Sequence, residues 1–199
     1  MRVVLGMVAR IALVCLFCAF AWANFAQWRA TGHPSGLGTT LLEGWVAAMF
    51  VFRRSNGVVS TRRLAWIAAP LGTFAMVFAR PSGGGIPNSA SELIQLAGVG
   101  FALVSLCTLG RSFGLVAANR GVKTRGPYGL VRHPAYTGYL ISYCAYIAEN
   151  PSPRNIALLA VSSVFQLLRI SEEELVLAGD AAYNAYRSRV RYRLIPLLY

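Results

Sequence analysis

Two short stretches of this sequence place side chains that could do chemistry in an otherwise apolar chain. One is the run Arg132-His133-Pro134, and the other contains Arg169 and, one helical turn later, Glu173. Pro134 suits the first turn of a helix, where its missing N–H costs nothing. Arg132 and His133 would then lie at a helix N-terminus, whose free N–H groups and dipole favour an anion. Arg169 and Glu173 share one helix face and are placed for an ion pair.

Both stretches fall at the ends of predicted helices that form a hairpin. Residues 134–149 and 155–178 are apolar enough to be helical, and the sequence between them, Asn-Pro-Ser-Pro, predicts a short turn. The hairpin brings the three adjacent glutamates, residues 172–174, back to the level of His133. Two charged groups that meet beside an apolar interior predict a pocket.

The composition predicts a membrane protein. Of 199 residues, 56% are hydrophobic and only 13% are charged, and the mean hydropathy is +0.51. A soluble domain carries roughly 25% charged residues, and a transmembrane helix needs about 20 apolar residues. We therefore expect an all-α integral membrane fold with about six spans, a C-terminal helical hairpin and a short cytoplasmic tail. The expected spans are residues 3–28, 37–52, 64–80, 91–110, 134–149 and 155–178.

The net charge of +12 has two possible explanations. Nucleic-acid binding would need a recognisable binding module, and none is visible, so we expect no nucleic-acid partner. The positive-inside rule explains the charge better, because most basic residues fall in loops on one side of the predicted membrane. Only Arg29, Arg80 and Arg154 fall on the other side. Both chain ends are therefore expected in the cytoplasm.

Three features of the N-terminal half have alternative explanations. The first apolar segment is expected to be an uncleaved anchor, although Ala21-Trp22-Ala23 also resembles a signal-peptide cleavage site. Glu43 is expected to be an interfacial side chain near the start of its span, the alternative being a functional carboxylate in the membrane. Cys15 and Cys18 have C-x-x-C spacing in an apolar run, where we expect neither a disulfide nor a metal site.

The pattern R-H-P-x-Y-x-G, followed by R-I-x-x-E-E, resembles the isoprenylcysteine carboxyl methyltransferase and phospholipid N-methyltransferase superfamily. The matching residues are Arg132, His133, Pro134, Tyr136, Gly138, Arg169, Ile170, Glu173 and Glu174. The tail also matches the family's Y-x-x-Y…V…P pattern at Tyr183, Tyr186, Val190 and Pro196. The likeness covers roughly residues 92–199. It divides the chain into N-terminal spans, residues 1–90, and a methyltransferase core, residues 91–199.

The resemblance implies an S-adenosylmethionine-dependent methyltransferase that acts on a hydrophobic acceptor in the membrane. It implies catalytic roles for Arg169 and Glu173, with Glu173 and Glu174 also holding the cofactor's ammonium group. The helix N-terminus at His133-Pro134 would hold the carboxylate with Arg132. The other expected cofactor-binding residues are Gly98, Gly100, Lys123, Gly126, Tyr128, Tyr136 and Tyr186. Gly98 and Gly100 have an equal alternative, close helix packing. The tail is expected to fold back as a lid.

The acceptor and the reaction class have alternatives. The element before Tyr128 reads G-V-K-T-R-G-P and matches the isoprenylcysteine enzymes only loosely, so an isoprenylcysteine-type carboxylate and a lipid both remain possible acceptors. An NADPH-dependent sterol or steroid reductase is disfavoured, because the paired carboxylates would repel its cofactor's phosphates. A non-catalytic scaffold would give Arg169, Glu173 and His133 no reason to meet. The bacteria-like composition predicts an inner-membrane location with the cofactor site facing the cytoplasm.

Overall fold

The computed structural model describes residues 2–54, 57–82 and 89–199, whose regular secondary structure is helical apart from two very short strands. The helices are α1 (Arg2–Thr31), α2 (Pro34–Phe52), α3 (Arg63–Phe74), α4 (Ser89–Leu109), α5 (Pro134–Glu149), α6 (Pro153–Leu177) and α7 (Ala181–Arg189). The 3₁₀ segments are η1 (Ala75–Phe78), η2 (Gly110–Ser112) and η3 (Gly126–Gly129). The strands are β1 (Val58–Val59) and β2 (Ala118–Asn119).

In the described part of the chain, four helices are long and apolar enough to cross a membrane. They are Gly6–Thr31, Pro34–Phe52, Ser89–Ser112 and Pro153–Leu177. The segment Arg63–Phe78 is apolar but shorter, and α5 has 16 residues. The expected all-α membrane architecture is confirmed, and four of the six expected spans have the length and hydropathy that a crossing requires.

Prolines define the starts of the helices that form the hairpin. Pro134 and Pro153 each occupy the first turn of their helix, where a proline loses no hydrogen bond. The Ser152 hydroxyl accepts a hydrogen bond from the Asn155 N–H at 3.1 Å and caps α6. The predicted hairpin is therefore confirmed: α5 occupies residues 134–149 as expected, and α6 begins at 153 rather than 155.

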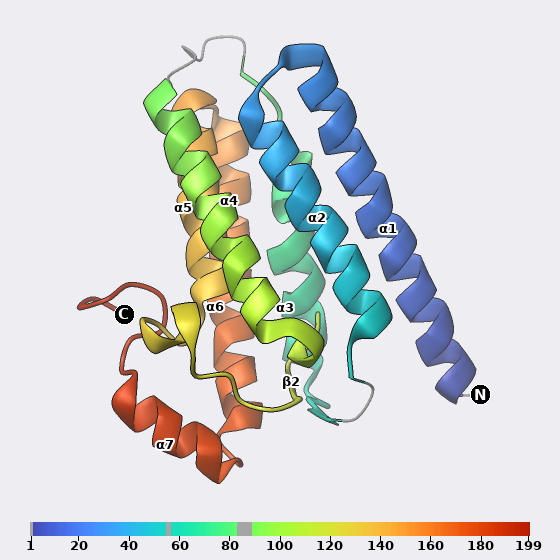
Figure 1. Cartoon of the computed structure of the whole chain (residues 1–199), viewed down its shortest axis with the longest axis vertical. Helices are drawn as coiled ribbons and strands as arrows, with labels where there is room; N and C mark the ends of the chain where they lie inside the picture. Colours follow the sequence, from blue (N-terminus) through green and yellow to red (C-terminus); the bar gives the residue numbers. More distant parts are fainter. Residues whose placement is uncertain (1, 55–56, 83–88) are drawn as a thin grey trace.

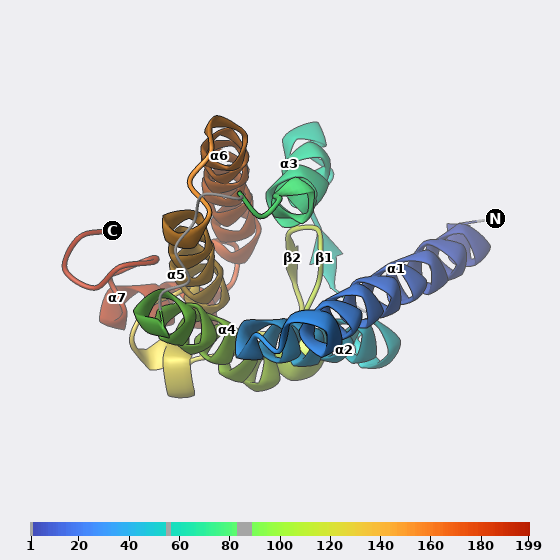
Figure 2. The same cartoon turned by 90° about the horizontal axis from the view of Figure 1, so that it is seen from above.

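The helices are arranged around a central space. In Figure 1, α1 to α6 run along the length of the molecule, α7 lies across one end, and both chain termini lie toward that end. Seen from above, α1, α2 and α4 form one side, α3 and α6 lie opposite, and α5 connects α4 with α6 (Figure 2). That both ends of the chain lie on the same side of the membrane stays a prediction.

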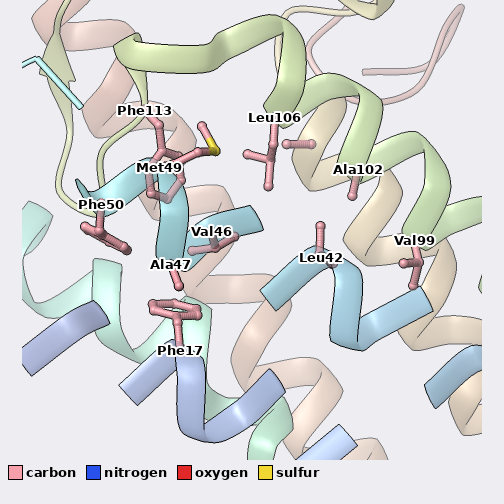
Figure 3. Packing of buried hydrophobic residues seen from close by; sticks show 11 residues of the cluster. Phe17, Leu42, Val46, Ala47, Met49, Phe50, Val99, Ala102, Leu106 and Phe113 are labelled. Carbon is pink, nitrogen blue, oxygen red and sulfur yellow. The ribbon is translucent and has the colours of Figure 1, made fainter. Parts of the chain in front are cut away.

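A cluster of buried apolar side chains joins α1, α2 and α4 (Figure 3). The ring of Phe17 stacks on Phe50 with centroids 5.6 Å apart, and Phe50 meets Phe113 edge-on at 5.2 Å. Phe17 also contacts Phe74 of α3 at 5.9 Å. Aromatic pairs of this kind add to the stabilisation that burial provides. The cluster therefore fixes the apolar side of the space that the helices surround.

A small antiparallel ladder that the sequence pattern did not predict joins the two basic loops. Val58 pairs with Asn119 and Val59 with Ala118. Beyond the ladder, the Ser60 N–H donates to the Ala117 carbonyl at 2.9 Å. These bonds hold the segment that follows α4 against the segment that precedes α3, so residues from both loops lie at one end of the helix bundle.

Helices α4 and α5 pack backbone to backbone at two glycines. A Cβ on Gly98 would lie 2.6 Å from the Ser142 nitrogen, and one on Gly138 would lie 2.6 Å from the Ala102 nitrogen. By contrast, a Cβ on Gly100 would meet nothing within 4 Å. The packing explanation of the G-x-G pattern therefore holds for Gly98, and Gly100 is not needed for the contact.

This difference predicts opposite effects for two neighbouring substitutions. Gly98→Ala should lower stability by about 1–3 kcal/mol, because the added methyl forces two backbones apart. Gly100→Ala should raise stability by roughly 0.5–1 kcal/mol, because alanine restricts the unfolded chain and nothing blocks its side chain. Thermal unfolding of both variants in the same detergent measures the difference. Equal shifts in both would contradict the packing explanation.

Candidate functional site

The helices enclose a cavity that reaches from the loop after α4 into the helix bundle. Its apolar wall comes from α1, α2 and α4, for example from Phe17, Leu42 and Leu106. Polar groups from several elements, α2 among them, also line the cavity. These include Glu43, Thr73, Arg120, Lys123, Arg132, His133, Tyr136, Tyr139, Tyr143, Gln166, Arg169 and Glu173. The cavity therefore joins a charged region to an apolar one.

His133 lies between two carboxylates of α6. Its Nδ1 is 3.6 Å from Glu173 Oε2, and its Nε2 is 3.3 Å from Glu174 Oε1. The ring is buried, with 6% of the residue exposed. Burial lowers the pKa of His133, but the hydrogen bonds and negative charges of the two glutamates outweigh it, so the pKa is raised above 6.5. The hairpin thus brings the two predicted charged groups into direct contact.

Glu174 is held by two arginines. Arg132 Nε lies 2.8 Å from Glu174 Oε1, and Arg193 Nη2 lies 2.9 Å from Glu174 Oε2. Arg132 Nη1 also donates to the Val190 and Arg191 carbonyls at 3.0 and 2.6 Å. Arg132 therefore joins α6 to the C-terminal segment, and the donors at its Nε and Nη1 are already engaged by the protein.

Arg169 occupies the other side of the site and contacts three elements besides its own. Its Nε lies 3.3 Å from Glu173 Oε1, which confirms the predicted i, i+4 ion pair. Its two terminal nitrogens donate to Thr73 Oγ1 at 2.9 Å and to the Gly114 carbonyl at 3.2 Å. The guanidinium also lies over the Tyr136 ring, 5.2 Å from the centroid. Tyr136 donates its hydroxyl hydrogen to Glu173, so Glu173 is oriented by groups from both helices of the hairpin.

The C-terminal segment folds back over the start of α5. The backbone N–H groups of Arg132 and His133 donate to the Tyr192 and Arg193 carbonyls, both at 2.9 Å. Tyr186 of α7 donates its hydroxyl hydrogen to the Tyr128 carbonyl at 2.7 Å. The predicted fold-back of the tail is observed, and it covers the N-terminus of α5 with backbone carbonyls.

Most of the predicted site residues lie together around the cavity. The predicted residues that line it are Lys123, Tyr128, Arg132, His133, Tyr136, Arg169, Glu173 and Tyr186. Gly98 and Gly100 lie on α4 away from the lining, Gly126 starts η3 with a positive φ of 59°, and Pro134 starts α5. Glu174 is directed at the two arginines that it pairs with. In this structure the group expected to hold a carboxylate, Arg132 at the helix N-terminus, has protein partners instead.

The prediction that Glu43 is interfacial is wrong. Glu43 is the central residue of α2, and even the expected span of residues 37–52 has it close to the middle rather than at an end. Its side chain lines the cavity, and its Oε2 is buried without a hydrogen-bond partner. Charged groups at such depth are rare and commonly serve function. Arg120 was also overlooked, because in the sequence it looks like any other basic loop residue.

The raised pKa of His133 predicts a pH-dependent contribution to stability. Because the folded-state pKa lies above the ordinary value of 6.5, this contribution is fully present below 6.5 and is lost as the pH rises through the folded-state pKa. We expect the difference in melting temperature between the wild type and His133→Gln to shrink as pH increases from about 6 to about 9. A difference that does not change with pH would show that the charge on His133 contributes nothing.

Comparison with known proteins finds one family similarity, in the C-terminal half of the chain. The sequence model of the isoprenylcysteine carboxyl methyltransferase (ICMT) family matches residues 93–179. This range includes most of α4, all of α5 and α6, and both segments that build the charged site. No curated protein matches the chain. Residues 93–179 are therefore similar to the isoprenylcysteine carboxyl methyltransferase family, and together with the apolar helices this similarity supports a membrane methyltransferase in general terms.

Proposed function

We propose that the protein transfers a methyl group from S-adenosylmethionine to a hydrophobic acceptor in the membrane, either an isoprenylcysteine-type carboxylate or a lipid. The observation that carries this proposal is the cavity itself. At one end it holds His133, Arg169 and Glu173 close together, and at the other its wall is apolar. A polar cofactor and an apolar acceptor need both environments in one continuous space.

The residues present fit the cofactor. Its ammonium group needs a carboxylate that is still accessible, and the Glu173 side chain is 21% exposed whereas that of Glu174 is 6% exposed and fully paired. Its adenosine needs flat faces, which the rings of Tyr128, Tyr136 and Tyr186 would provide around the cavity. When bound, S-adenosylmethionine supplies an electrophilic methyl group on a sulfonium centre. We therefore assign the ammonium to Glu173 and a structural role to Glu174.

The protein's own contribution is to orient the acceptor and exclude water. Arg169 is fixed by Glu173, Thr73 and Gly114, so it would favour an anionic acceptor such as a carboxylate, which needs no base, through its positive charge rather than through free hydrogen-bond donors. An amine acceptor would have to lose a proton, and Glu173 is the carboxylate placed to accept it. The apolar wall around Phe17 would hold the hydrocarbon part of either acceptor.

Calorimetric titration of the detergent-purified protein with S-adenosylhomocysteine tests the proposal. We expect micromolar binding that is lost in Glu173→Ala, with NADPH as the parallel ligand. Arg154→Ala serves as a matched control, because Arg154 is exposed in the first turn of α6 and does not line the cavity. Binding of NADPH alone would assign the protein to the reductases, and binding of neither ligand would favour a scaffold.

A further inference from the structure

Arg120 places its guanidinium directly against the backbone of Gly114 in the cavity wall. A Cβ on Gly114 would lie 2.2 Å from Arg120 Nη1 and 2.9 Å from its Cζ, so only glycine leaves room for this position. The Gly114 carbonyl is the same group that accepts a hydrogen bond from Arg169. The antiparallel pair of β1 and β2 holds Arg120 here, because Arg120 immediately follows Asn119 of β2.

Arg120 has no counter-charge at ion-pair distance among residues 2–54, 57–82 and 89–199. Its Nε is buried without a hydrogen-bond partner. Burial is the main reason why its pKa is lowered; the positive charge of Arg53 also lowers it, and the more favourable charge of Glu173 only partly compensates. A half-buried guanidinium in this situation is unfavourable on its own and gains from an anion that supplies the missing partner.

The other arginines that line the cavity are already paired. Arg132 is engaged by Glu174 and by carbonyls of the C-terminal segment, and Arg169 is engaged by Glu173, Thr73 and Gly114. Arg169 Nε also lacks a hydrogen bond, but it lies 3.3 Å from Glu173 Oε1, so among the described residues Arg120 is the cavity-lining arginine without an ion pair. Lys123, which also lines the cavity, adds positive charge in the same loop.

We propose that Arg120 binds the carboxylate of the cofactor's methionine moiety, while Glu173 binds its ammonium. The inference rests on the proposed function and assigns to Arg120 a role that the R-H-P motif was expected to fill. An amino-acid group carries its two opposite charges on one carbon, so it needs an acid and a base close together. Arg120 and Glu173 both lie beside Arg169 and so provide a base and an acid in one part of the cavity. Arg169 pairs with Glu173 and donates to the carbonyl of Gly114, the glycine against which the Arg120 guanidinium packs.

The test compares two ligands on the full-length protein. S-adenosylhomocysteine carries the carboxylate, whereas 5′-methylthioadenosine keeps the nucleoside and sulfur but lacks the amino-acid group. We expect Arg120→Gln to weaken S-adenosylhomocysteine binding by about 10- to 100-fold, the range of a charged hydrogen bond. Binding of 5′-methylthioadenosine should stay within about twofold of the wild type. Arg125→Gln, an exposed residue of the same loop outside the cavity lining, should change neither.

Gly114→Ala provides a second route that leaves every charge in place. Its methyl group would displace the flexible end of Arg120, so it should reproduce the selective loss of S-adenosylhomocysteine affinity. Unchanged affinity in Arg120→Gln, or an equal loss for both ligands, would overturn the role of Arg120 while wild-type binding still supports the proposed function. Failure of the wild type to bind S-adenosylhomocysteine would overturn both.

Discussion

Replacing Glu174 with glutamine is expected to lower stability by about 3–5 kcal/mol, the effect of removing one partner from a buried ion pair. The side chains of Arg132 and Glu174 are only 5% and 6% exposed, and Arg193 approaches the other carboxylate oxygen at 2.9 Å. The neutral amide would leave Arg132 buried without its counter-charge. It would also release Arg193, and with it the C-terminal segment that covers the start of α5.

Thermal unfolding in detergent measures this effect, with Glu149→Gln as the control. Glu149 is the last residue of α5, and its substitution by glutamine removes the same charge as Glu174→Gln. Unlike Glu174, it makes no ion pair with another described residue. Limited proteolysis gives a second readout, because a released C-terminal segment should be cleaved faster in Glu174→Gln. If the two variants melted at the same temperature and were cleaved equally, the Arg132–Glu174–Arg193 network would not hold the tail.

The hairpin was predictable because its signals are local. Pro134 and Pro153 determine where α5 and α6 begin, and the i, i+4 spacing of Arg169 and Glu173 is a property of one helix. Since two helices joined by a short turn run back alongside each other, the contact of His133 with Glu173 followed from their positions in sequence. These features make up most of the charged end of the site.

The rest of the site depends on contacts between distant segments. Nothing near Arg120 in the sequence distinguishes it from other basic loop residues; its position comes from the pairing of β2 with β1, some 60 residues away in the chain. Glu43 lies at the middle of α2, and its position on the cavity depends on how α2 packs against the other helices, which no local pattern indicates. Arg132 was expected to face a ligand, but the C-terminal segment provides partners that no local pattern indicates.

Arg169→Lys is expected to reduce methyl transfer by about 100-fold under the proposed function, the effect of misplacing a reacting group by roughly 1 Å. Lysine keeps the charge but has no planar fork. It therefore cannot contact Glu173, Thr73 and the Gly114 carbonyl at once, as the guanidinium does. Loss of these directional bonds would leave both the acceptor and Glu173 poorly oriented, even though the net charge of the cavity is unchanged.

Transfer of label from radiolabelled S-adenosylmethionine to an extract of bacterial membrane lipids, or to a farnesylcysteine, measures the rate. Arg154→Lys serves as the control, since Arg154 is exposed at the start of α6. S-adenosylhomocysteine affinity is measured for both variants, because a defect in orientation should lower the rate far more than it lowers cofactor binding. If Arg169→Lys instead kept the wild-type rate, positive charge alone would be sufficient at this position, and the three fixed contacts of Arg169 would serve only to stabilise the junction of α3 with α6.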